Sequence, residues 1–230
     1  MVSSEPDIAS VAKVLGEPAR AAICLALMDD RARPASELAR AANVSAQTAS
    51  NHLAKLIASG IVRVERQGRW RYYRLANDEV AHAIEALAVV APTAGARGPG
   101  GQCPEALALY AARTCYRHLA GKLGVALADA LLREGWLAED DGGYRVSPEG
   151  ETFLGGLGIE VAVLRRRGRA VARRCLDWSE RRPHVAGPLG AALADLALDR
   201  DWVRRQRGTR AVLLTPLGRS EFRRVFHVRL

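Results

Sequence analysis

The 230-residue sequence is poor in aromatic residues, at 5%, and contains only four cysteines. Hydrophobic residues still make up 49% of it, so leucine, valine and alanine must build most of any core. No apolar run approaches the ~18 residues needed to cross a bilayer, and Met1 to Ser10 is acidic without a signal-like apolar stretch. These absences argue against a membrane protein and predict a cytoplasmic one, whose cysteines are reduced thiols.

The positive charge of the chain is unevenly distributed. Its net charge of +9 comes from 34 basic and 25 acidic residues. Residues 1–91 hold 11 of the basic and 10 of the acidic ones, so most of the excess lies in 92–230. Five arginines nevertheless gather between Arg63 and Arg74, where local positive charge suits a phosphate backbone.

A helix suited to DNA contact is predicted after residue 44. Short and amide side chains on one side suit base edges, and a lysine suits phosphate. Ser45 is placed as the N-cap of this helix. Its apolar side is predicted to comprise Val44, Thr48, Leu53 and Leu56. The residues predicted to contact DNA are Ser45, Gln47, Thr48, Ser50, Asn51, His52 and Lys55.

The flanking segments complete a motif. A shorter helix is predicted over 34–43, and two helices joined by a tight turn make a helix-turn-helix. After Gly60 the chain alternates, turns at Gln67-Gly68 and continues in a β-rich segment, which predicts a two-stranded wing. Three wing arginines are predicted to contact phosphate or the minor groove, namely Arg66, Arg69 and Arg71.

Residues from about 8 to 91 resemble the ArsR/SmtB family of winged-helix repressors. The resemblance rests on Leu15-Gly-Glu-Pro-Ala-Arg20, on Ser-x-x-Thr-x-Ser-x-His-Leu at 45–53 and on Gly68-Arg-x-x-x-Tyr-x-Leu75. It implies a homodimer that places two recognition helices in successive major grooves of a double-stranded operator. It also implies a dimer interface built from the first and last helices of the domain, roughly 6–16 and 78–90.

Two metal sites of that family are not carried over. Its arsenic and cadmium sensors have Glu-Leu-Cys-x-Cys where this chain has Glu37-Leu-Ala-Arg-Ala41, so the thiolates are missing. Its zinc sensors use an Asp-x-His pair with a later His and Glu in the last helix. Here that helix offers His82 and Glu85 alone.

A second domain is expected because the chain is longer than one winged helix requires. Residues 1–91 should form the DNA-binding and dimerisation domain, and the Gly- and Pro-rich stretch 92–102 a linker. Within 103–230, His118-Leu-Ala-Gly-Lys-Leu-Gly returns 66 residues later as His184-Val-Ala-Gly-Pro-Leu-Gly.

Each copy, about 115–164 and 181–230, predicts a helix, a hairpin and a second helix opened by Ser-Pro or Thr-Pro. The predicted fold class is therefore mainly α with short β-hairpins. It combines an N-terminal winged helix-turn-helix with a C-terminal domain of two helix-hairpin-helix repeats, which senses an effector or mediates interactions.

The second domain also carries a candidate sensing site. Cys115 precedes His118 by three on a predicted helix, which places both on one face. Cys175 precedes the equivalent histidine, His184. If the two copies face each other, two thiolates and two imidazoles converge, a set suited to zinc or another thiophilic ion as cofactor. The alternatives are buried cysteines with helix-capping histidines, a redox-sensing thiol, and a small organic effector between the halves.

Together these features predict a sequence-specific transcriptional regulator. We expect a repressor that is released by a signal sensed in the C-terminal domain, with an effector that the sequence does not identify. A non-specific architectural DNA-binding protein and a redox-sensing regulator are the alternatives. No nucleophile elbow, phosphate loop or paired acid motif supports an enzyme.

Overall fold

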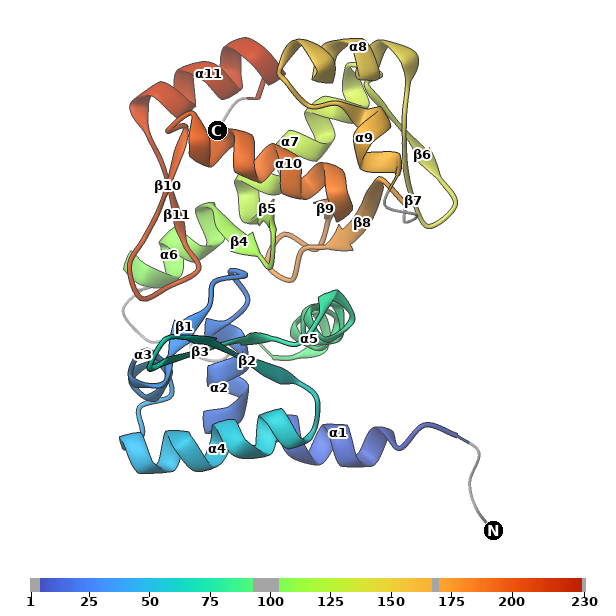
Figure 1. The fold of residues 1–230 in the computed structure, drawn as a ribbon. Helices are drawn as coiled ribbons and strands as arrows, with labels where there is room; N and C mark the ends of the chain where they lie inside the picture. Colours follow the sequence, from blue (N-terminus) through green and yellow to red (C-terminus); the bar gives the residue numbers. More distant parts are fainter. Residues whose placement is uncertain (1–4, 93–103, 167–169, 229–230) are drawn as a thin grey trace. The chain divides into compact units, whose positions relative to one another are not determined.

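The computed structural model describes residues 5–92, 104–166 and 170–228 (Figure 1). The chain divides into two compact units, Met1–Glu85 and Ala86–Leu230. Apart from Pro92, the predicted linker 92–102 lies outside the described residues. Within the described ranges, no helix combines the length and apolar composition that a bilayer span requires.

The first unit packs helices against a small antiparallel sheet of order β1-β3-β2. Its helices are α1 (Ile8–Leu15), α2 (Pro18–Ala26), α3 (Ala35–Ala41), α4 (Ala46–Ala58) and α5 (Asp78–Val90), the last of which crosses the boundary between the units. Its strands are β1 (Arg33–Pro34), β2 (Val62–Gln67) and β3 (Trp70–Leu75). Aliphatic side chains such as Ile23, Leu38 and Leu53 are fully buried between these elements. This is the winged helix-turn-helix that the sequence predicts.

Helix α4 forms where the sequence places it. The Ser45 hydroxyl accepts a hydrogen bond from the backbone N–H of Thr48 at 3.1 Å, which caps the first turn. The buried residues are Ala49, Leu53 and Leu56, whose spacing of four and three defines one helix face. Thr48 is exposed, so its predicted place on the apolar side is wrong, because the buried stripe runs through Ala49 instead.

The second unit has one continuous core, to which every one of its helices except α6 contributes. Its helices are α6 (Pro104–Ala111), α7 (Gly121–Arg133), α8 (Pro148–Gly156), α9 (Val161–Arg165), α10 (Gly187–Asp199) and α11 (Pro216–Phe226). Its strands are β4 (Arg113–Cys115), β5 (His118–Ala120), β6 (Leu137–Asp140), β7 (Gly143–Val146), β8 (Ala172–Leu176), β9 (Pro183–Ala186), β10 (Val203–Arg205) and β11 (Val212–Leu214). Leucine, valine and alanine dominate the core, with a few aromatics such as Trp202 and Phe222.

One order of elements occurs twice in this unit. A hairpin, a helix, a second hairpin and a second helix follow one another as β4–β5, α7, β6–β7, α8, and again as β8–β9, α10, β10–β11, α11. Ser147 and Thr215 cap the last helix of each set by accepting a hydrogen bond from the glycine N–H three residues on. The second set begins at Ala172, upstream of 181.

The first hairpin of each set attaches to the second hairpin of the other. Strand β8 continues the β6–β7 hairpin, with Gly143 opposite Arg173, to give a sheet of order β6-β7-β8-β9. Arg113 of β4 correspondingly bridges to Ala211, next to β11. Helix α7 packs on β9 and α10 packs on β5. The two sets are therefore interlocked, so neither has a core of its own.

Candidate DNA-binding surface and cysteine-histidine cluster

Helix α4 presents a polar face to solvent. Its exposed polar residues are Gln47, Thr48, Ser50, Asn51 and Lys55. The Gln47 amide donates to the side-chain oxygen of Asn51 at 3.4 Å, one helical turn away. Amides and hydroxyls on an exposed helix can exchange such weak contacts for hydrogen bonds to base edges.

The structure places His52 on the inner side of α4, contrary to the prediction that it contacts DNA. Its Nδ1 lies 3.4 Å from Oε2 of Glu17, and its side chain is only 15% exposed. Glu17 caps α2 by accepting hydrogen bonds from the N–H groups of Ala19 and Arg20. The Arg20 guanidinium in turn donates to carbonyls at the end of α1. His52 therefore helps to hold α4 against α2, and the Leu-Gly-Glu-Pro-Ala-Arg element organises three helices.

The β2–β3 wing carries two kinds of arginine. Arg63 and Arg74 each pair with Glu65, at 3.3 and 3.2 Å. In contrast, three exposed arginines form no ion pair with any described residue; they are Arg66, Arg69 and Arg71.

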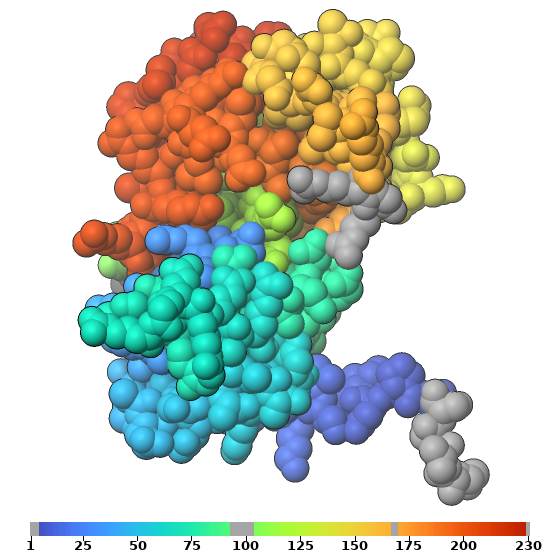
Figure 2. All heavy atoms as spheres, viewed as in Figure 1, coloured from blue at the N-terminus to red at the C-terminus, as the bar shows by residue number. Residues whose placement is uncertain are grey.

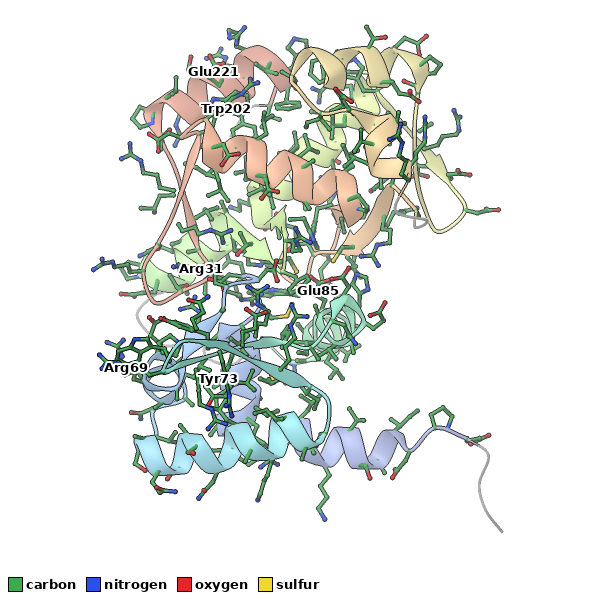
Figure 3. The ribbon with its side chains drawn as sticks, viewed as in Figure 1. Arg31, Arg69, Tyr73, Glu85, Trp202 and Glu221 are labelled. Carbon is green, nitrogen blue, oxygen red and sulfur yellow. The ribbon has the colours of Figure 1, made fainter. Side chains whose placement is uncertain are left out.

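Two of these three lie directly opposite each other. Arg66 and Arg71 are cross-strand partners, an arrangement that repels in the absence of an anion. Arg69 lies at the tip of the wing (Figure 3), where its guanidinium covers the Trp70 ring at 5.1 Å. Tyr73 anchors the other end of the wing in the core. The wing thus offers a set of exposed cations that an anion would stabilise.

Apolar side chains remain exposed on the first and last helices of the winged-helix region. Helix α1 has no buried residue and extends away from the rest of its unit (Figure 2). Ile8 on α1 is 74% exposed and Val90 on α5 is 78% exposed. Val11 and Leu87 add to these two surfaces.

The structure overturns the helical prediction for 115–118. Cys115 ends β4 and His118 begins β5, so the two residues are joined by a two-residue turn and pair across the hairpin. Cys175 and His184 pair in the same way across β8 and β9. A spacing of three fits either a helix face or such a hairpin, which explains the error. Cross-strand partners share one face, so each hairpin presents a thiol beside an imidazole.

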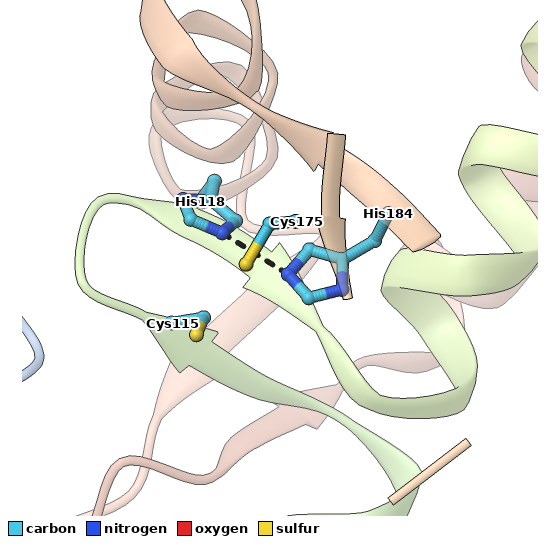
Figure 4. Close-up of side chains that lie close together, drawn as sticks. All are labelled: Cys115, His118, Cys175 and His184. Atoms are coloured by element: carbon cyan, nitrogen blue, oxygen red, sulfur yellow. Dashed lines mark hydrogen bonds between the residues drawn. The ribbon is translucent and has the colours of Figure 1, made fainter. Parts of the chain in front are cut away.

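The two hairpins bring the four predicted residues together (Figure 4). One ligand atom from each of Cys115, His118, Cys175 and His184 lies within 4.8 Å of the other three. The two imidazole Nε2 atoms are 3.0 Å apart. Cys175 is half-buried and the other three are buried. We refer to these four residues as the Cys-His cluster.

Two equivalent glycines lie beside the histidines of the cluster. A Cβ atom at Gly190 would lie 3.0 Å from the Cβ of His118 and 2.3 Å from the carbonyl oxygen of Val185. A Cβ atom at Gly124, the equivalent position in the first set, would lie 3.6 Å from the Cβ of His184. The Cβ at Gly124 would also lie 2.4 Å from the carbonyl oxygen of Leu119, so the repeated glycine allows each central helix to begin close to the hairpin of its own set.

A buried ion pair that sequence reasoning missed lies beside the cluster. Arg113 donates to Oδ1 of Asp177 at 2.8 Å, and both side chains are 0% exposed. Oδ2 of Asp177 accepts the N–H of Gly121 at 2.7 Å and lies 3.4 Å from Nδ1 of His184. Within the described residues, that Nδ1 has no hydrogen-bond partner. The guanidinium also stacks on the Trp178 ring, 4.1 Å from its centre.

Burial and neighbouring charges together shift the pKa values of Asp177 and His184. Burial alone would raise the pKa of Asp177, but the Arg113 guanidinium and hydrogen bonds from Ser179, Gly121 and Glu180 hold it well below its usual range. The pKa of His184 falls to about 4, chiefly because burial disfavours the imidazolium; Asp177 opposes this fall and Arg113 adds to it. The carboxylate is thus ionised and the imidazole neutral at pH 7.

The sequence repeat extends upstream of the two histidines and includes the two cysteines of the cluster. Ala112-Arg-x-Cys115 returns as Ala172-Arg-x-Cys175, with an offset of 60 where the histidines have 66. The difference of six arises between the cysteine and the histidine: two residues separate Cys115 from His118, whereas eight separate Cys175 from His184, and Asp177 is one of those eight. Extending the repeat upstream would have placed both cysteines in it. It would not have shown that this longer segment folds back onto Arg113.

Comparison with known proteins gives relatives for the whole chain and for its first unit. Residues 15–65 match the model of a helix-turn-helix domain family. The HTH-type transcriptional regulator YdfF of Bacillus subtilis is 44% identical over 225 residues, which cover 98% of this chain and 99% of YdfF. The HTH-type transcriptional repressor SmtB of Mycobacterium tuberculosis is 40% identical over 72 residues, 31% of this chain and 53% of SmtB.

Among solved structures, the homodimeric winged helix-turn-helix domain of Mb0332 from Mycobacterium bovis is described as a possible ArsR-family regulator. It is 30% identical, covers 39% of this chain and 89% of its own, and superposes with a TM-score of 0.34.

Proposed function

The chain belongs to the ArsR/SmtB family of winged helix-turn-helix transcriptional regulators, and we propose that it is a cytoplasmic, homodimeric repressor of specific operators. The observation that carries this proposal is the exposed polar face of α4 beside a wing with three arginines that form no ion pair with any residue that the structure describes. Gln47, Thr48, Ser50 and Asn51 are assigned to the major groove, with Ser45 at the start of the helix. Phosphate or minor-groove contacts are assigned to Lys55, Arg66, Arg69 and Arg71.

The exposed apolar surfaces of α1 and α5 support the dimer. Ile8, Val11, Leu87 and Val90 would each expose apolar area in a monomer, at a cost of about 25 cal/mol per Å². A two-fold dimer would cover them and set the spacing of the two recognition helices. That spacing must match about one turn of DNA, roughly 34 Å, for both helices to enter the major groove.

The signal is proposed to act on the second unit. In the second unit, the exposed polar residues of α11 are Arg219, Ser220, Arg223 and Arg224, without the amides that α4 presents, whereas the Cys-His cluster gathers two thiols and two imidazoles in the interior. A signal that binds there must favour a conformation whose recognition helices no longer match the operator. As a regulator of this family, the protein is not proposed to be an enzyme.

Fluorescence anisotropy tests the DNA-binding proposal. The protein is titrated with DNA from upstream of its own gene and with random DNA at one fixed salt concentration. A specific regulator should prefer the operator by about 1,000-fold or more. A ratio close to one would instead favour a non-specific architectural protein.

Three variants separate base contacts from phosphate contacts. Gln47→Ala should cost roughly 1–3 kcal/mol on the operator and relax discrimination at one base pair. Arg69→Ala should weaken binding to both DNAs and reduce the salt slope by about one. Arg63→Ala, in which an arginine already paired with Glu65 is removed, is the matched control and should change little. Equal losses on both DNAs for Gln47→Ala and Arg69→Ala would contradict the assignment.

A further inference from the structure

The Cys-His cluster has the composition and geometry of a metal site. We propose that Cys115, His118, Cys175 and His184 bind one divalent, thiophilic cation of the zinc type in tetrahedral geometry, and that this ion is the signal of the regulator. The second part rests on the proposed function. The first part does not, and the experiments below separate the two.

The distances fit four ligands around one ion. Zn–N bonds of about 2.1 Å and Zn–S bonds of about 2.3 Å place tetrahedral ligand atoms roughly 3.3–3.8 Å from each other. In the structure the two Nε2 atoms are 3.0 Å apart, and all four ligand atoms lie within 4.8 Å. Side-chain adjustments of about 1 Å or less would therefore complete the tetrahedron. Each hairpin contributes a rigid cross-strand pair, so the ion would join the two sets of elements.

The charge of the ligand set selects the class of ion. Two thiolates neutralise a divalent cation, whereas a monovalent ion would leave a net negative charge in a buried site. Calcium and magnesium require oxygen ligands, which the four residues lack. Arsenite is a thiolate-seeking species and would use only the two sulfurs. Two thiolates with two imidazoles match zinc and its neighbours, and four protein ligands leave no open position for a catalytic water.

Asp177 acts as the positioning residue for this site. Its Oδ2 lies 3.4 Å from Nδ1 of His184, a buried nitrogen without a hydrogen-bond partner among the described residues. A carboxylate at that place keeps the proton on Nδ1, so the lone pair of Nε2 faces the cluster. Such outer carboxylates orient metal-bound imidazoles and raise their basicity. Arg113 holds the carboxylate in place from the opposite side.

One of the four ligands is partly exposed to solvent. Cys115, His118 and His184 are buried, but Cys175 is half-buried on β8 and so borders the outside. An entry path of this kind is required of any site that exchanges its ion. A signal ion must exchange, so the accessibility of one ligand agrees with a sensing site.

Cobalt(II) gives a direct test of geometry. The reduced, chelator-treated full-length protein is titrated with cobalt(II) and followed by absorption spectroscopy. We expect one equivalent per chain, the intense visible bands of tetrahedral cobalt and near-ultraviolet thiolate-to-cobalt charge transfer. Zinc(II) should then displace the cobalt, because it binds such ligands more tightly. Weak octahedral bands without charge transfer would overturn the proposal.

Matched variants assign the ligands. Cys115→Ser and Cys175→Ser should each weaken cobalt binding by about 100-fold or more and remove part of the charge-transfer band. Cys24→Ala replaces a cysteine of the other unit, and His227→Asn replaces an exposed histidine outside the cluster. Both controls should keep the full spectrum and affinity. Retention of the spectrum in either cluster variant, or its loss in a control, would refute the ligand set.

A separate variant tests the positioning residue. Asp177→Asn keeps the shape of the side chain but loses the negative charge that faces both Arg113 and His184. We expect cobalt affinity to fall about 10- to 100-fold while the tetrahedral bands persist. An unchanged affinity would show that Asp177 has no influence on the ligand.

Measurements of operator binding test the regulatory role of the ion independently of its binding to the protein. Anisotropy on upstream DNA is measured for the metal-free and the zinc-loaded protein, and again for Cys175→Ser. We expect zinc to weaken operator binding at least tenfold in the parent protein alone. Tight cobalt binding with unchanged DNA affinity would leave a metal site and refute its role as signal. Specific operator binding without any tetrahedral cobalt spectrum would support the repressor and refute the metal site.

Discussion

Removal of the Arg113 side chain should destabilise the second unit strongly. The guanidinium contacts Asp177 at 2.8 Å, and neither side chain is exposed to solvent. At an effective dielectric constant of about 20, that distance corresponds to roughly 6 kcal/mol of attraction. Hydrogen bonds from Gly121 and Ser179 remain on the carboxylate in Arg113→Ala and offset part of the loss. We therefore expect the free energy of unfolding to fall by about 3–5 kcal/mol, as for other buried pairs that lose one partner.

Urea unfolding measures this change. Far-ultraviolet circular dichroism follows the helices, and tryptophan fluorescence reports the four tryptophans, among them Trp178, on which Arg113 stacks. The matched control is Arg182→Ala. Arg182 contacts Asp129 at 2.7 Å, a similar distance, but the two side chains are 60% and 37% exposed. Solvent screening should limit the effect of that change to about 1 kcal/mol or less.

The two variants are compared by their unfolding midpoints. If Arg113→Ala and Arg182→Ala lower the unfolding midpoint equally, burial does not amplify the ion pair and the reasoning fails. If Arg113→Ala leaves the free energy of unfolding unchanged, the remaining hydrogen bonds must be sufficient to stabilise the Asp177 carboxylate. A large effect confined to Arg113→Ala is the expected outcome.

Two further predictions concern packing and thiol reactivity. Gly190→Ala should lower the free energy of unfolding by about 1–3 kcal/mol, because its Cβ would lie 2.3 Å from the carbonyl oxygen of Val185. Gly155→Ala is the control: it adds a Cβ to an exposed helical position with open space, and should be neutral or stabilising in the same urea experiment. Burial, opposed only weakly by the charge of Arg20, raises the pKa of Cys24 to about 12. In the folded, metal-free protein, mass spectrometry should find that iodoacetamide modifies Cys24 about tenfold or more slowly than the half-buried Cys175; equal rates would contradict its burial.

Local signals in the sequence predicted most of the first unit. The cap at Ser45, the apolar periodicity of α4 and the turn at Gly68 each depend on neighbouring residues, so a pattern suffices to place them. His52 was misplaced because Glu17, its partner, lies far away in the sequence. A polar residue on a recognition helix suggests DNA contact until the element packed beside it is known.

The prediction for the second unit was based on its repeat. The errors in that prediction have the same physical origin as the error at His52. The duplication correctly paired His118 with His184, and it led to the convergence of four side chains that the structure contains. It could not distinguish a hairpin from a helix at 115–118, because both place residues three apart on one side. Nor could it find Asp177, whose partner Arg113 is 64 residues away.

The interlocked hairpins explain why the Cys-His cluster should need both sets of elements. One hairpin alone supplies a thiol and an imidazole, which is half of a tetrahedral ligand set. Because β4–β5 attaches to the second set and β8–β9 to the first, the ligands converge only when both sets are folded together. Yet the symmetry is incomplete, since the longer loop of the second hairpin alone carries Asp177 toward an imidazole. An ion bound there would therefore stabilise the joint arrangement of the two sets, and its loss would loosen that arrangement without unfolding either hairpin.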